Sequence, residues 1–91
     1  MDKQHFQALV SAVGAKESNG WWEVPEGKGV TLYVASNSVQ LTIPRAVAIR
    51  IEDKLLLAKT AKGETFIVQE ADVFAGSIDG GVSTTRKAGF L

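Results

Sequence analysis

Few residues in this sequence have side chains that could carry out catalysis. His5 is the only histidine, and it lies in the first turn of a predicted helix, on the polar side. Glu52 and Asp53 are adjacent carboxylates, but they occupy a predicted turn, where Asp is favoured for its local hydrogen bonding. Catalysis requires such groups to meet in a protected site, and no spacing here predicts that they do. The sequence therefore predicts a protein that is not an enzyme.

Cofactor and metal sites are not predicted either. Residues 27–29 read Gly-Lys-Gly, but a predicted strand follows them, and no helix N-terminus is available to face a phosphate. The chain has no cysteine and one histidine, which leaves no ligand set for structural zinc. We expect no cofactor and no metal.

Positive charge gathers in the middle of a chain whose formal net charge is zero. Residues 30–63 carry a net charge of +3, and Tyr33, Trp21 or Trp22 could add a ring on which a base stacks. A chain that neutralises several phosphates is rarely neutral overall, so weak binding of nucleic acid or an anionic ligand is the alternative function. The candidate anion-binding residues are Arg45, Arg50, Lys54, Lys59 and Lys62.

Apolar residues on both sides of the same predicted strands give the main functional prediction. Residues 55–58 and 66–68 are uninterrupted apolar runs, whereas a sheet with one wet face alternates apolar and polar residues. Such strands are buried on both faces, pack on a second copy, or offer an apolar groove to another partner. The adjacent Trp21 and Trp22 point to opposite faces of a strand, and tryptophan is common in interface hot spots. The candidate interface residues are Trp21, Trp22, Leu55, Leu57 and Ile67.

These observations predict a small non-catalytic binding or assembly module whose partner is a protein or a second copy of the chain. A net charge of zero does nothing to oppose association. No apolar run is long enough to span a bilayer, so no membrane partner is expected. The polar start of the first helix differs from a signal peptide, and the absence of cysteine excludes a disulfide scaffold. We expect a cytoplasmic protein.

One folded domain is expected from 91 residues, of which 45% are hydrophobic and 22% charged. Residues 2–13 predict an amphipathic helix, with Asp2 as its N-cap and Gly14 as its left-handed C-terminal residue. The helix is too short to be stable alone and needs a surface to pack on. Its apolar stripe consists of Phe6, Leu9, Val10 and Val13.

Six short strands are expected between residues 21 and 69, and short links predict that sequence neighbours pair antiparallel. Pro44 cannot donate to a ladder and marks a strand end or a bend. The expected fold is mainly β (α+β by count of elements): the helix packs on a meander that forms a small barrel or a strongly coiled sheet. The expected strands are 21–24, 30–35, 38–43, 46–51, 54–60 and 64–69.

The end of the chain is expected to be less regular. Residues 70–75 predict one short helical turn anchored by Val73 and Phe74, which completes a domain over residues 1–76. Residues 77–91 are mostly small and polar, and we expect them to form a flexible tail.

Overall fold

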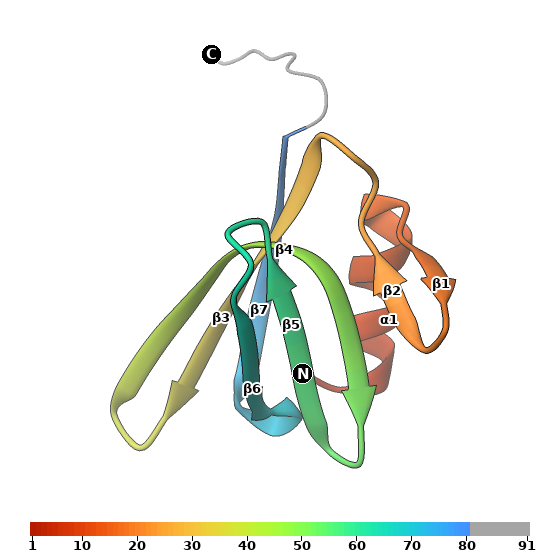
Figure 1. Ribbon diagram of the computed structural model, residues 1–91. Helices are drawn as coiled ribbons and strands as arrows, with labels where there is room; N and C mark the ends of the chain where they lie inside the picture. Colours follow the sequence, from red (N-terminus) through yellow and green to blue (C-terminus); the bar gives the residue numbers. More distant parts are fainter. Residues whose placement is uncertain (81–91) are drawn as a thin grey trace, which may run out of the picture.

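The computed structural model describes residues 1–80, which form one α-helix, one short 3-10 helix and a seven-stranded antiparallel sheet (Figure 1). The expectation of a mainly β fold with an N-terminal helix is confirmed. In chain order, the elements are α1 (Lys3–Val13), β1 (Lys16–Ser18), β2 (Trp21–Glu23), β3 (Lys28–Ser36), β4 (Val39–Glu52), β5 (Leu55–Thr60), β6 (Thr65–Gln69), η1 (Glu70–Asp72) and β7 (Val73–Gly80).

The helix α1 begins and ends as its capping residues predict. The Asp2 side chain accepts a hydrogen bond from the His5 amide at 2.7 Å, which satisfies one of the free N–H groups of the first turn. Gly14 ends the helix at a φ of 79°, in the left-handed region that glycine adopts without a steric penalty. The predicted apolar stripe is buried, and it comprises Phe6, Leu9, Val10 and Val13.

Tight turns join the consecutive strands from β3 to β6. Asn37–Ser38 and Asp53–Lys54 both have two residues with positive φ, as in the type I′ turns that match the twist of a hairpin. Gly63 (φ 90°) closes the third turn, and its amide donates to the Thr60 carbonyl at 2.9 Å. These three predicted hairpins are confirmed, although the first two turns lie one residue later than expected.

The sheet has two parts, one formed by β3 and β7 and the other by β1, β2, β5 and β6. The 14-residue strand β4 connects them. Its first half pairs with β3, and its second half pairs with β2 and β5. In between, Pro44 and Arg45 form a bulge in the pairing with β3, and Arg45 has a φ of 48°. Bulges bend a strand, and β4 arches across the molecule (Figure 1). The predicted bend at Pro44 is confirmed, but residues 38–43 and 46–51 belong to one bent strand, because a proline is tolerated at a bulge.

The order of the strands differs from a simple meander. β2 pairs with β1 and β4 rather than with β3, so the hairpin predicted across residues 25–29 is wrong. After β6, the short η1 leads the chain to the far side of β3, where β7 pairs. Within residues 1–80 no pairing joins β6 to β7. The sheet is therefore open, and the predicted small barrel is wrong.

The strand β7 lies where the sequence predicted a helical turn and the start of a tail. Only residues 70–72 are helical, and pairing with β3 continues through Gly80. Small residues in β7 leave room for the helix, since a Cβ added at Gly76 would lie 2.9 Å from Cδ2 of Leu9. The expected tail therefore includes four residues, 77–80, that belong to a strand. Its remainder, residues 81–91, lies outside the described residues.

The core lies between α1 and the concave side of the bent sheet, which we call the inner face. Leu9 packs near Leu32 and Gly76, and the Phe6 ring contacts Trp22 edge to face. Thr60 is the one buried polar residue of the described chain, and its hydroxyl accepts the Glu64 amide at 3.2 Å. The largest fully buried side chains are Leu32, Ile43, Ile49, Leu56, Val13, Val30 and Val73.

Candidate functional site: the outer face of the sheet

Strand register gathers a set of side chains on the side of the sheet opposite the core. Leu57 of β5 lies directly between Arg50 of β4 and Ile67 of β6. Leu55 and Lys59 share this side, because residues two apart in a strand point the same way. We use the name outer face for the surface formed by Trp21, Arg50, Leu55, Leu57, Lys59 and Ile67.

The apolar residues of the outer face are accessible. Ile67 is 61% exposed, Leu55 is 40% exposed, and Leu57 is half-buried between its neighbours. The alternating residues Leu56 and Ala58 are fully buried on the inner face. The uninterrupted apolar run of β5 therefore has one core side and one exposed side. Burial on both faces, one of the three sequence-based explanations, is wrong.

Trp21 lies on the outer face between two cations. The ammonium nitrogen of Lys59 is 4.5 Å from the centre of the Trp21 ring, and the Arg50 guanidinium carbon is 5.9 Å from it. Both distances fall within the range of cation–π attraction. Arg50 also forms an ion pair with Glu52, at 3.2 Å between Nε and Oε1. The ring and the charged groups thus hold one another in place beside the apolar residues.

Trp22 points to the inner face, as the alternation of a strand requires. Its ring centre lies 6.3 Å from that of Phe6, with the planes at 80°. This is the edge-to-face geometry that aromatic pairs favour, and it fixes α1 against β2. Of the five predicted interface residues, the structure brings four together, and Trp22 belongs to the packing of the helix.

The predicted anion-binding residues do not form one surface. Arg50 and Lys59 flank Trp21, whereas Lys54 lies in the β4–β5 turn. Arg45 and Lys62 line a small depression at the bulge of β4, where the Ala61 amide donates to the Arg45 carbonyl at 3.0 Å. The five cations therefore occupy three separate places.

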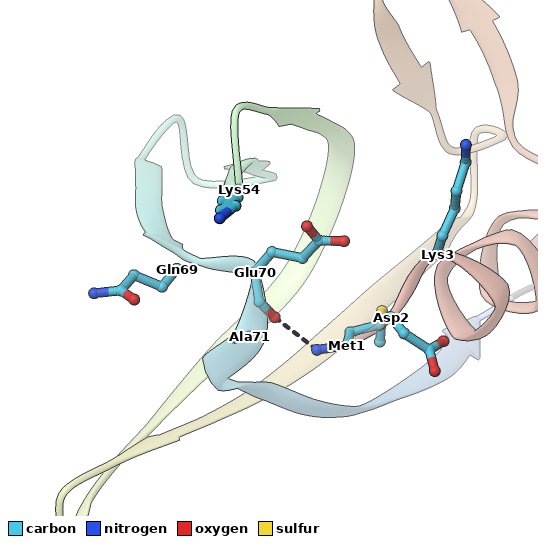
Figure 2. A pocket seen from close by; sticks show the side chains of 7 residues that line it. All are labelled: Met1, Asp2, Lys3, Lys54, Gln69, Glu70 and Ala71. Atoms are coloured by element: carbon cyan, nitrogen blue, oxygen red, sulfur yellow. Dashed lines mark hydrogen bonds between the residues drawn. The ribbon is translucent and has the colours of Figure 1, made fainter.

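A second hollow lies between the start of α1 and η1 (Figure 2). The Met1 amino group donates to the Glu70 carbonyl across it, at 2.6 Å. Figure 2 shows the Lys3 and Gln69 side chains pointing in different directions rather than toward a common point. The hollow therefore lacks the converging polar groups of a binding site. Its lining residues are Met1, Asp2, Lys3, Lys54, Gln69, Glu70 and Ala71.

No group of three or more His, Cys, Asp or Glu side chains within residues 1–80 is placed to hold a metal ion. No helix within the same residues has the length and apolar character needed to cross a membrane.

Sequence reasoning missed several exposed apolar residues. Phe74 was expected to anchor a helical turn, but it is the extra residue where the register between β7 and β3 shifts. It is 57% exposed, and its ring centre lies 6.3 Å from that of Tyr33. Val39 and Leu41 are also exposed, on the arm of the β3–β4 hairpin. Their alternation in the sequence matched a strand with one buried side, so it gave no signal of exposure.

No family model matches this chain, and no match was found among curated proteins or solved structures. Function is therefore inferred from the side chains and backbone of the chain itself.

Proposed function

We propose that this protein is a non-catalytic binding or assembly module that contacts a protein partner through the outer face. The observation that carries this proposal is the row of Leu55, Leu57 and Ile67 on one side of the sheet, with the half-buried Trp21 on the same side beyond Arg50. A contiguous exposed apolar surface beside polar residues marks an interaction site. Protein interfaces combine an apolar centre containing aromatic residues with a polar rim, and Arg50 and Lys59 supply charge beside this centre.

Weak binding of nucleic acid or an anionic ligand is the alternative. The observation in its favour is the position of Lys59 and Arg50 beside Trp21, since a ring flanked by cations can stack on a base. Two observations weigh against it. Arg50 already pairs with Glu52, and the remaining cations lie away from the ring.

The proposal is tested by capturing proteins from the native cell extract with the immobilised chain and two charged variants. Leu57→Lys places a charge in the centre of the outer face, and we expect it to reduce capture of any partner at least tenfold. Thr42→Lys adds the same charge at an exposed position of β4 outside the outer face, and it should leave capture unchanged. Equal capture by all three proteins would contradict the proposal, provided that both variants melt within a few degrees of the wild type.

Salt dependence separates the two candidate functions. Contact through apolar side chains changes little with ionic strength, whereas contacts to phosphates weaken steeply. We expect capture through the outer face to persist between 50 mM and 500 mM salt. A loss of capture over that range would favour the anionic ligand.

A further inference from the structure

We infer that β6 is a self-pairing edge, through which two copies of this chain join their sheets in an antiparallel dimer. The inference rests on the proposed function in that it names a second copy as a partner. It uses backbone groups at the edge of the sheet, however, and not the side chains in the middle of the outer face.

The strand β6 has a neighbour on one side only within the described residues, because it pairs with β5 alone. Hydrogen bonds at both ends of this ladder show which backbone groups face β5. The Thr60 amide donates to the Glu64 carbonyl, and the Glu70 amide donates to the Lys54 carbonyl, each at 2.8 Å. Hydrogen-bonded pairs alternate in an antiparallel ladder. The residues whose amide and carbonyl groups point away from β5 are therefore Thr65, Ile67 and Gln69.

The edge of β6 lacks the features that normally prevent sheets from pairing. Its five residues include no charged side chain and no proline, and its register with β5 is regular. Natural edge strands are usually protected by charge, proline, a bulge or short length. Each of the other two outer strands has such a feature: β1 is only three residues long and carries the exposed charges of Lys16 and Glu17, and β7 has a bulge at Phe74.

A second copy fits this edge in one register better than in any other. With the two-fold axis at Ile67, Ile67 lies opposite Ile67 of the second copy, and Thr65 lies opposite its Gln69. Every outward amide of one copy then meets an outward carbonyl of the other, and the five residues of β6 bring no charged side chain into the shared ladder. The two outer faces become continuous, and the exposed Ile67 side chains cover each other. The net charge of zero adds no long-range repulsion.

The same register makes a second prediction about the residues at either end of the strand. Glu64 of one copy approaches Glu70 of the other at both ends of the shared ladder. Like charges opposite each other weaken a pair of strands. Replacing Glu64 by Lys converts both contacts into opposite charges, so Glu64→Lys should tighten the dimer by about threefold or more.

Disulfide trapping tests the dimer directly, since the natural chain has no cysteine. In the proposed register the Cα atoms of residue 67 lie about 5.5 Å apart, within the span of a disulfide. We expect Ile67→Cys to form a covalent dimer under mild oxidation. Leu57→Cys is the control, because the two copies of β5 lie three strand spacings apart, roughly 14 Å. A mixture of Thr65→Cys and Gln69→Cys chains should form the mixed dimer, and neither variant should cross-link alone.

The outcomes distinguish this inference from the proposed function. Cross-linking through Leu57→Cys rather than Ile67→Cys would overturn edge pairing and indicate that the outer faces pack together. Assemblies larger than a dimer in analytical ultracentrifugation would indicate pairing of β6 with β7 of the next copy, and would also overturn it. A monomer at all concentrations, with no cross-linking at residue 67, would overturn it as well. None of these results depends on whether Leu57→Lys reduces capture of another protein.

Discussion

Arg45 has a backbone conformation that residues other than glycine rarely adopt. Its φ of 48° lies in the left-handed region, where the Cβ of an ordinary residue approaches the following carbonyl oxygen. The conformation persists because Pro44 and Arg45 together form the bulge that bends β4 from β3 toward β5. Position 45 therefore matters for its backbone conformation, whereas Arg45 was predicted to matter for its charge.

We expect Arg45→Gly to leave the free energy of unfolding unchanged or to raise it by up to about 1 kcal/mol, because glycine removes the strain. Arg45→Val should lower it by about 1–2 kcal/mol, because a branched side chain increases the strain. Urea denaturation measures both values. The two variants lose the same guanidinium group, so equal losses of stability would show that the charge matters and the conformation does not.

Among the elements, β7 is the strand that its own amino-acid composition gave the least reason to expect. Apart from Ile78, residues 77–80 are small or polar, yet each of the four has a partner in residues 28–31 of β3. Ile78 lies opposite Val30, which is fully buried in the core. The last part of β7 therefore pairs along one edge of β3, which is a central strand of the sheet.

A pair of shortened chains tests the contribution of these residues. A chain ending at Gly80 is the reference, and a chain ending at Gly76 lacks the four pairs with β3. Cross-strand pairs contribute about 0.2–1 kcal/mol each, so the shorter chain should be less stable by roughly 1–4 kcal/mol. For a domain of this size, that loss lowers the melting temperature by at least about 5 °C. Equal melting temperatures would show that residues 77–80 add nothing to the stability of the sheet.

The elements that could be predicted from the sequence are those whose signals are local. The helix has its caps and its stripe within residues 2–14, and the three confirmed hairpins depend on residues at their own turns. The partner of β2 could not be predicted, because Trp22 pairs with Ile49, far away in the sequence. β7 was missed because its glycines and serine suggest a tail, and only the approach of Leu9 explains why a small residue is needed there.

The candidate site was predictable to the extent that it depends on strand alternation. Alternation predicts that Trp21 and Trp22 point to opposite faces, and that Leu55 and Leu57 lie together. It does not predict which face the helix covers, because that depends on how the sheet bends around α1. The separation of the cations likewise depends on the turns at the two ends of β5, which place Lys54 and Lys62 far from Trp21.

In the molecule as a whole, β4 belongs to both parts of the sheet, so neither part is complete without the other. Its first half contributes Ile43 to the core beside β3, and its second half contributes Ile49 beside β2 and β5. One cluster of buried residues includes side chains from α1 and from both parts of the sheet. A single core of this kind favours cooperative unfolding.

We expect unfolding in urea to follow one transition whichever signal is recorded. Tryptophan fluorescence reports on β2, which carries both tryptophans, and circular dichroism reports on the whole backbone. The two curves should share the same midpoint and the same slope. If fluorescence changed at a lower urea concentration, β1, β2 and α1 would form a separate unit that unfolds before the rest.

The tight turns between β3 and β6 also determine the order in which contacts can form during folding. Each of these four strands meets its partner across a connection of two to four residues, and short connections have a low entropic cost of closure. Contacts between residues close in the sequence form quickly, whereas β2 needs Ala48 and Ile49 from the far half of β4. During synthesis, α1 and β2 leave the ribosome before the far half of β4. They therefore wait with Phe6 and Trp22 uncovered until the middle of the chain has formed the surface on which they pack.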